Sequence, residues 1–237
     1  MAKKEYNHVD GLLLVDKPAD WTSFDVVNLV KRHFWLDKTG HCGTLDPFAT
    51  GLLVVLLGKA TRLQDSLMAQ QKCYTGTIRL GVETSTEDLT GEVTATADVP
   101  AWTLEKFQEI ASSFLGDIEQ LPPMHSAIKI NGQPLYKLAR KGQEVERQPR
   151  PVHIDRFELS NLRLPDVDFT VECSKGTYIR TLGADFGRKA GCGAHLTALR
   201  RQRSGDHVVD GAVTVEELKA WDLETLKAHV QPLEALA

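Results

Sequence analysis

The stretch His41-Cys42-Gly43-Thr44-Leu45-Asp46-Pro47-Phe48-Ala49-Thr50-Gly51, followed by Leu52-Leu53-Val54-Val55-Leu56-Leu57, decides the fold of this chain. The apolar run has the length of a buried strand and predicts a central one. The preceding segment carries one carboxylate, Asp46, between glycines and next to Pro47, which restricts the backbone. A stiff loop joined to a buried strand holds Asp46 in one place, as a nucleophile or base requires. An Asp-Pro pair alone is typical of an ordinary turn, so the rest of the chain has to decide.

Other patterns predict elements on both sides of this segment. Leu12 to Val15 reads as a short buried strand, and Thr22 or Ser23 can cap a helix that turns Val26, Val27, Val30 and Phe34 inward. Further strands are predicted at 74–80, 93–96 and 167–173, and the strand at 93–96 is expected to pair with the one at 74–80. An extended segment is predicted at 196–209. Helices are predicted at 61–69, 103–114, 135–140, 177–190, 213–220 and 223–230. The irregular mixture favours an α+β fold with a mixed sheet.

Length and composition bound the class of protein. The chain has 237 residues, of which 42% are hydrophobic, enough to bury one large core. No apolar stretch approaches the ~20 residues of a membrane-spanning helix, and the charged N-terminus lacks the apolar region of a signal peptide. The four cysteines are widely spaced, which suggests neither a zinc site nor a disulfide framework. A reducing cytoplasm fits this cysteine usage.

Charge is distributed unevenly along the chain. The net charge of −4 argues mildly against an RNA-binding protein, which usually shows a basic surface. However, residues 83–119 are mainly acidic, whereas 129–156 and 175–203 are richer in lysine and arginine. A polarised protein can present a basic face at negative net charge. We therefore expect RNA contact through the two basic segments, the alternative being ordinary solvated faces.

The segment around Asp46 resembles the catalytic loop of the TruB family, the tRNA pseudouridine synthases that act on uridine 55 of the T loop. Other stretches are similar to motifs of the same family and occur in the family's order between residues 10 and 215. They are Gly11-Leu12-Leu13-Leu14-Val15-Asp16-Lys17-Pro18 with Thr22-Ser23, Lys72-Cys73-Tyr74, Leu121-Pro122-Pro123-Met124-His125-Ser126-Ala127-Ile128-Lys129, Cys173-Ser174-Lys175-Gly176-Thr177-Tyr178-Ile179-Arg180, and Gly191-Cys192-Gly193-Ala194-His195-Leu196 running into Leu199-Arg200-Arg201.

The resemblance implies the pseudouridine synthase fold, an α+β arrangement of a central mixed β-sheet flanked by helices with an active-site cleft. We expect a single catalytic domain over residues 1–237, with a mobile RNA-binding insertion at approximately 124–152. Many bacterial relatives continue into a small C-terminal RNA-binding domain of the PUA type. The helices predicted near the C-terminus reach residue 237, so we expect no PUA domain and RNA affinity from the catalytic domain itself.

The resemblance also implies the chemistry. A uridine inside a folded loop is extruded into a pocket, its C1′–N1 bond breaks, and C1′ joins C5 of the turned base. Asp46 would act as nucleophile or as base at the sugar, two roles that stay open here. Arg180 is the expected cationic partner of Asp46, and Tyr74 the expected stacking partner of the flipped base. The reaction has no redox or hydrolytic step, so we expect no cofactor and no metal.

We expect five further residues to support substrate binding or the catalytic loop, of which Asp88 matches a position of the family. His41 is expected to fill the space left by the extruded nucleotide or to stack on a neighbouring base, the alternative being a hydrogen bond to the loop backbone. Asp88 is expected to organise the cleft, or else to be an acidic turn residue. Tyr178 and Leu199 are expected beside the uracil, with core packing as an equal alternative. Lys17 is expected to hold the catalytic loop through hydrogen bonds.

Basic residues supply weaker candidates for contacts with RNA phosphates. Lys59 and Arg62 lie near a predicted helix N-terminus, where phosphates are often bound. The remaining candidates are Lys129, Arg140, Lys141, Lys175, Arg200 and Arg201.

Two other functions compete with a tRNA pseudouridine synthase that works as a cytoplasmic monomer. One is a non-catalytic protein that unfolds and refolds the T loop; the joint presence of Asp46, Tyr74 and Arg180 argues against a loss of activity. The other is a metal-dependent hydrolase using His41, Asp46 and Asp88, although these residues lack the spacing of paired metal ligands.

Overall fold

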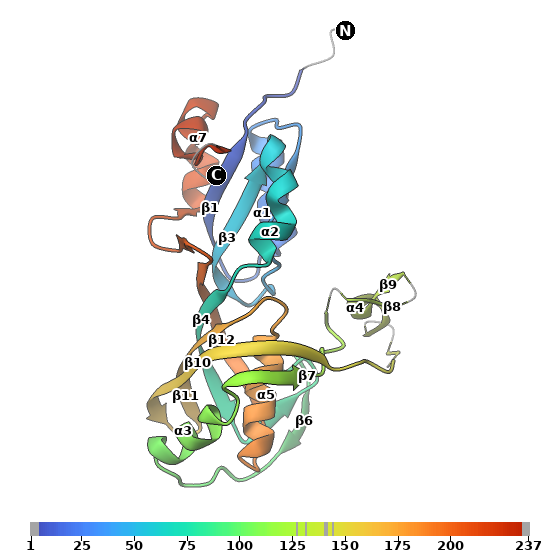
Figure 1. Ribbon diagram of the computed structural model, residues 1–237, viewed down its shortest axis with the longest axis vertical. Helices are drawn as coiled ribbons and strands as arrows, with labels where there is room; N and C mark the ends of the chain where they lie inside the picture. Colours follow the sequence, from blue (N-terminus) through green and yellow to red (C-terminus); the bar gives the residue numbers. More distant parts are fainter. Residues whose placement is uncertain (1–4, 127, 131, 140–141, 144, 234–237) are drawn as a thin grey trace. The chain divides into compact units, whose positions relative to one another are not determined.

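The computed structural model describes residues 5–126, 128–130, 132–139, 142–143 and 145–233. It confirms an α+β fold with a mixed sheet (Figure 1). The chain divides into two compact units, one formed by Met1–Tyr74 and Leu199–Ala237 and the other by Thr75–Ala198. A single catalytic domain over residues 1–237 stays a prediction. Within the described ranges, no helix has both the length and the apolar character to cross a membrane.

The main sheet of the described residues has ten strands. They are β1 (Gly11–Lys17), β2 (Thr39–His41), β3 (Thr50–Leu57), β4 (Lys72–Leu80), β7 (Gly116–Gln120), β10 (Arg150–Arg163), β11 (Asp166–Cys173), β12 (Ala194–Ser204), β13 (His207–Val208) and β14 (Val213–Thr214). Their order is β14-β1-β3-β12-β4-β11-β10-β7, with β2 paired to β3 and β13 to β12. β3 is antiparallel to β1 but parallel to β12, so the sheet is mixed.

The remaining elements belong to one unit or the other. The first unit contains α1 (Ser23–His33), the 3₁₀ helix η1 (Gly58–Leu63), α2 (Gln64–Met68), α6 (Val215–Ala220) and α7 (Leu223–His229). The second contains α3 (Leu104–Ser112), α4 (Leu135–Ala139), α5 (Ile179–Lys189) and two small sheets, one of β5 (Val82–Thr84) and β6 (Val93–Thr96), the other of β8 (Lys129–Ile130) and β9 (Gln133–Pro134).

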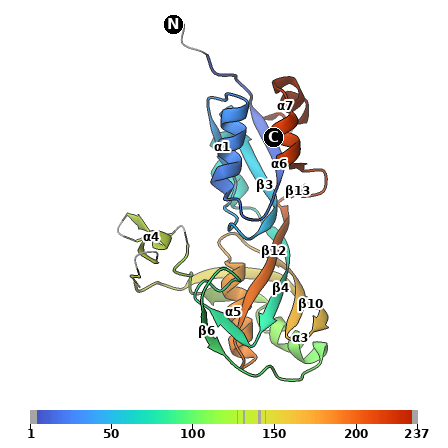
Figure 2. The ribbon, with the colours of Figure 1, turned by 180° about the vertical axis from the view of Figure 1, so that it is seen from behind.

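The predicted central strand, β3, is buried on both faces. Its odd-numbered residues 53, 55 and 57 pack in one hydrophobic cluster with side chains of α1, α6 and α7. Its even-numbered residues 52, 54 and 56 pack in another with Ala60 of η1 and Leu67 of α2. Figure 1 shows α2 in front of β3, and Figure 2 shows α1 in front of the opposite face. Burial on both faces explains why the sequence of this strand is an uninterrupted run of apolar residues.

α1 begins where the sequence predicts. The side chain of Thr22 accepts from the Asp25 N–H at 3.0 Å, and the Asp25 carboxylate accepts from the Thr22 N–H at 2.9 Å. This reciprocal capping box satisfies backbone donors that the first helical turn leaves unpaired. Val26 and Val30 are fully buried, which confirms the predicted inward face of the helix.

The second unit has an aromatic core. The ring centroid of Phe186 on α5 lies 6.2 Å from that of Phe107 on α3 and 5.9 Å from that of Phe157 on β10. Gly187 lets α5 approach the start of β12, because a Cβ at this position would lie 2.4 Å from the backbone nitrogen of Ala194. Close backbone contact and aromatic packing therefore fix α5.

Some predicted elements differ from the structure. The prediction that 93–96 pairs with 74–80 is wrong, because β6 pairs with β5 instead. The helix predicted at 61–69 is divided between η1 and α2, and the long strand β10 with its partner β7 was not predicted. The predicted insertion at 124–152 contains β8, β9, α4 and the start of β10.

Replacing Gly51 with alanine should destabilise the first unit strongly. Gly51 has φ +100°, and its Cβ would lie 2.4 Å from the carbonyl oxygen of Arg201 on β12. Backbone strain and the steric clash together predict a loss of at least about 2 kcal/mol in the free energy of unfolding, measured by urea denaturation.

Gly116→Ala is the matched control, since Gly116 also has a left-handed φ, +85°, but has no atom within 4 Å of its Cβ position. It should lose only about 1 kcal/mol from backbone strain. Equal losses for the two variants would contradict the close approach of β3 and β12 at Gly51.

Candidate active site

The loop that carries Asp46 is held on one side by a buried arginine of β12. Arg201 is only 1% exposed, and its guanidinium donates from Nε to the Leu52 carbonyl at 2.7 Å and from Nη2 to the Gly43 carbonyl at 3.2 Å. One side chain therefore ties the start of the loop to β3. The prediction that Arg201 contacts RNA phosphates needs correction, because its side chain is engaged inside the protein.

The other side of the loop is tied to α1 and the segment before it. The Ser23 hydroxyl accepts from the Leu45 N–H at 2.9 Å and donates to the Leu45 carbonyl at 3.3 Å. The Pro47 carbonyl accepts from the Asp20 N–H at 2.8 Å. The residues on both sides of Asp46 are thus bonded to the same segment. Sequence reasoning treated Ser23 only as a possible helix cap and missed these two bonds.

Lys17 contacts both the Asp46 loop and the segment before α1. Its ammonium group donates to the carbonyls of Pro18 at 2.8 Å, Trp21 at 2.7 Å and Pro47 at 3.2 Å, and its side chain is fully buried. Burial lowers the pKa of Lys17 to about 8, although the nearby carboxylate of Asp46 acts in the opposite direction. The three carbonyls compensate the ammonium for lost hydration. Lys17 therefore joins the first predicted motif to the Asp46 loop.

His41 and Cys42 lead into the loop. Nδ1 of His41 is buried and has no hydrogen-bond partner among the described residues, and burial lowers the pKa of this imidazole. The Cys42 N–H donates to the Val54 carbonyl at 3.0 Å, which anchors the loop to β3 once more. Burial raises the pKa of the Cys42 thiol to about 11, so it stays protonated at neutral pH and is a poor nucleophile.

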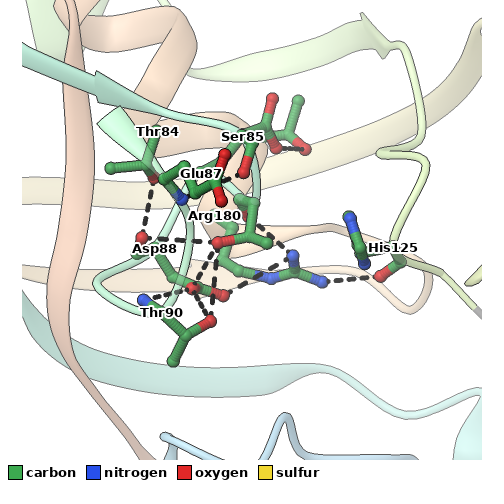
Figure 3. A network of polar contacts seen from close by, with 10 residues as sticks. Thr84, Ser85, Glu87, Asp88, Thr90, His125 and Arg180 are labelled. Carbon is green, nitrogen blue, oxygen red and sulfur yellow. Dashed lines mark hydrogen bonds and ion pairs between the residues drawn. The ribbon is translucent and has the colours of Figure 1, made fainter. Parts of the chain in front are cut away.

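Arg180, at the start of α5, lies in a buried polar network of the second unit. Figure 3 shows its guanidinium between Asp88 and the backbone of His125. It donates to the carbonyls of Thr86 at 2.8 Å and His125 at 2.9 Å, and Nη1 lies 3.7 Å from the Asp88 carboxylate. That carboxylate also accepts from the Thr86 hydroxyl at 2.6 Å and the Thr90 N–H at 2.9 Å. A buried ion pair needs such additional donors and acceptors to be stable.

Glu87 belongs to this region, although sequence reasoning missed it. Its backbone has φ +61°, and its carboxylate accepts from the Thr181 hydroxyl at 2.6 Å. Burial raises the pKa of Glu87, against the opposing effects of the Thr181 hydrogen bond and the Arg180 charge. The run of hydroxyl and acidic residues at 84–90 was the available signal, because such side chains bond to nearby backbone in turns.

The other predicted substrate contacts are divided between the units. Tyr74 on β4 and Leu199 on β12 are both 7% exposed, and they belong to the unit that carries His41 and Asp46. Tyr178 is half-buried in the other unit, where its N–H donates to the side chain of Gln120 at 2.7 Å. The predicted pairing of Asp46 with Arg180 would join the two units and stays a prediction.

The phosphate candidates differ in their availability. Arg200 forms a bidentate pair with Asp16 at 2.9 and 2.7 Å, and Lys59 forms an exposed pair with Asp10 at 3.2 Å. Arg62 and Lys175 are exposed. Lys129 begins β8, whereas Arg140 and Lys141 lie outside the described residues. In the part of the chain that the structure describes, no three His, Cys, Asp or Glu side chains are grouped as metal ligands would be.

Two family models match this chain. Residues 31–179 match the N-terminal domain of the TruB family pseudouridylate synthases. Residues 180–237 match the C-terminal domain of tRNA pseudouridylate synthase B. Together they include both the β3 strand and the Arg180 network.

Curated relatives are similar over most of the chain. The tRNA pseudouridine synthase B of Opitutus terrae is 46% identical over 225 residues, which cover 95% of this chain and 93% of the relative. The protein of the same name from Geotalea uraniireducens is 49% identical and covers 97% of this chain and 74% of the relative.

Solved structures share the fold. A chain from a crystal structure of a Cbf5-Nop10-Gar1 complex matches 95% of this chain with a TM-score of 0.74 and 32% identity. A chain from an H/ACA RNP bound to a substrate RNA containing 2′-deoxyuridine matches with a TM-score of 0.71 and 29% identity. This chain spans 60% of the length of each. Since a family model matches more than half of the sequence and relatives nearly half identical cover almost all of it, the chain belongs to the TruB family of pseudouridylate synthases.

Proposed function

We propose that this enzyme, an isomerase by its family, converts uridine 55 in the T loop of tRNA to pseudouridine. The observation that carries the proposal is the anchored loop around Asp46, whose neighbours Gly43, Leu45 and Pro47 are all hydrogen-bonded to surrounding elements. A carboxylate held in this way is suited to attack or proton abstraction at one fixed position. The relatives named tRNA pseudouridine synthase B support tRNA as the substrate.

In the proposed reaction, the uridine leaves the base stack and enters the site. Asp46 either attacks C1′ or removes a proton from the sugar, and the C1′–N1 bond breaks. The detached uracil turns and a C1′–C5 bond forms, while the bond between Asp46 and C1′ breaks or the sugar regains its proton. N1 gains a proton and C5 loses one. The product is an isomer of the substrate, so no electron acceptor and no water molecule is consumed. We propose that the enzyme works in the cytoplasm as a monomer without cofactor or metal.

Tyr74 and Arg180 would complete the site. An aromatic ring that stacks on the extruded uracil supplies about 1–3 kcal/mol per base. Arg180 is the proposed cationic partner of Asp46, and its contacts to Asp88 and the Thr86 carbonyl keep the guanidinium in place. His41, Tyr178 and Leu199 would line the space around the base, and the exposed cations Arg62 and Lys175 would meet phosphates.

Asp46→Asn should abolish the reaction and leave tRNA binding within about threefold of the wild type, because the amide keeps the shape but loses the charge that attack requires. The measurement is tritium release from tRNA transcript labelled with [5-³H]uridine, together with filter binding of the same transcript. Turnover by Asp46→Asn would exclude Asp46 as nucleophile or base. Wild-type protein that binds tRNA but releases no tritium would instead support the RNA-remodelling function.

Tyr74→Phe should retain stacking and therefore the Kd for tRNA. If the hydroxyl takes part in proton transfer at C5, kcat should fall by roughly 10²–10⁴-fold, the usual contribution of a positioned acid or base. Single-turnover tritium release measures the chemical step. An unchanged rate would restrict Tyr74 to stacking, while Tyr74→Ala, which removes the ring, should weaken binding as a control.

Arg201→Met should remove both loop hydrogen bonds and leave the carbonyls of Gly43 and Leu52 without these donors. Buried acceptors without partners cost about 1–3 kcal/mol each, so both stability and kcat should fall. Arg201→Lys keeps a donor and should recover part of both. If Arg201→Met folds with normal stability and normal kcat, the loop does not depend on this residue.

A further inference from the structure

α1 presents an unusual side chain to solvent beside the Asp46 loop. Phe24 is 69% exposed, the largest exposed fraction among the large hydrophobic side chains of the described residues. The inward face of α1 buries Val26, Val27 and Val30 in the core. Burial of a phenylalanine contributes about 1.5–3 kcal/mol, so its placement in water brings no stability to the free protein. This suggests that Phe24 meets a ligand.

The exposed face of α1 continues from Phe24 with polar and basic residues. Asn28 lies four residues after Phe24, Lys31 lies three residues after Asn28, and Arg32 is next to Lys31. These spacings place all of them on the same side of a helix. Lys31 and Arg32 are exposed, and neither forms an ion pair within the described ranges. Asn28 and Arg32 also line an open cavity of about 570 Å³.

Hydrogen bonds link this face to the candidate catalytic loop. Ser23, the residue before Phe24, bonds in both directions to Leu45, the residue before Asp46. Adding standard covalent distances along this path puts the Cα atoms of Phe24 and Asp46 at most about 15 Å apart. A side chain at Phe24 is therefore within one or two nucleotides of a uridine that reaches Asp46.

We propose that Phe24, Asn28, Lys31 and Arg32, here called the α1 face, form an RNA-contact surface for the strand that enters the site. Phe24 stacks on an unpaired T-loop base near the extruded uridine, and Lys31 and Arg32 meet phosphates of the same strand. Asn28 lies between them and supplies amide hydrogen bonds. The inference rests on the proposed function, because it takes tRNA as the substrate.

The charge of the surroundings agrees with this assignment. Asp25 is exposed next to Phe24, but its carboxylate accepts from the N–H and the hydroxyl of Thr22 and is engaged in the helix cap. Asp20 and Asp25 both line the cavity near the start of α1, whereas Lys31 and Arg32 lie in the last turn of the helix. The positive charge of this face is therefore concentrated at the Lys31 and Arg32 end. The aromatic contact therefore lies at the end near the loop and the phosphate contacts at the other.

Binding of a T-arm stem-loop RNA tests the α1 face without dependence on turnover. In the Asp46→Asn background, Phe24→Ala should raise the Kd roughly five- to hundredfold, whereas Phe24→Tyr should stay within about threefold of Phe24. Lys31→Ala and Arg32→Ala should each reduce the slope of log K against log salt by about 0.7–0.9, whereas Phe24→Ala should leave this slope unchanged. Thermal stability should not change in any of these variants.

Two controls in the other unit keep the test specific. Leu115→Ala removes an exposed large apolar side chain, and Lys106→Ala removes an exposed cation. Both should leave the Kd and the salt slope unchanged. With active enzyme, Phe24→Ala should raise KM while kcat stays within about twofold, as expected for binding made equally in ground and transition states.

An unchanged Kd for Phe24→Ala would overturn the proposal. A lower oligomer mass for this variant by light scattering would also overturn it, because Phe24 would then contact another copy of the chain. Failure of the proposed function looks different. In that case wild-type protein would release no tritium from tRNA, whatever residue stands at position 24.

Discussion

The buried guanidinium of Arg201 is the contact on which the structure around Asp46 depends. Its bonds to the carbonyls of Leu52 and Gly43 join β12, β3 and the loop in one place. A buried charge without a carboxylate partner is costly, and Arg201 has no such partner within 4 Å among the described residues. The backbone of β12 approaches β3 closely at Gly51, where a side chain would clash. The hydrogen bonds of Arg201 to the two carbonyls offset the cost of burying its charge and hold the loop in place.

The second set of contacts comes from the segment that precedes α1. Lys17 and Ser23 bond to Pro47 and Leu45, so the loop is held from the side opposite Arg201 as well. The capping box at Thr22 fixes the first turn of α1, and the packing of α1 on β3 fixes the helix. Core packing therefore determines where the loop backbone lies. This links the stability of the unit to the position of Asp46.

Local signals in the sequence were sufficient for the parts of the fold that depend on neighbouring residues. The apolar run 52–57 and the cap at Thr22 predict β3 and α1 because burial and capping are visible within a few residues. Strand pairing depends on residues far apart in the sequence. For this reason the predicted partner of β6 was wrong, and β10 and β7 were not predicted.

The adjacent residues Arg200 and Arg201 show why the site was harder to predict. Both were expected to meet RNA phosphates. Along a strand, neighbouring side chains point to opposite faces, so one arginine enters the core and the other pairs with Asp16 near the surface. Only the register of β12 against β3 decides which residue is buried. Similarly, motif resemblance identified Asp88 and Arg180, but only the folded backbone brings Thr86, Glu87 and Thr90 around them.

If Asp46 catalyses the proposed reaction at uridine 55, the enzyme modifies one nucleotide of tRNA. The most direct measurement maps pseudouridine in an unmodified tRNA transcript after incubation with the enzyme, by carbodiimide labelling and primer extension. We expect one reverse-transcription stop that reports position 55, and none with Asp46→Asn. Stops at several uridines, or a stop at 55 that persists with Asp46→Asn, would contradict this expectation.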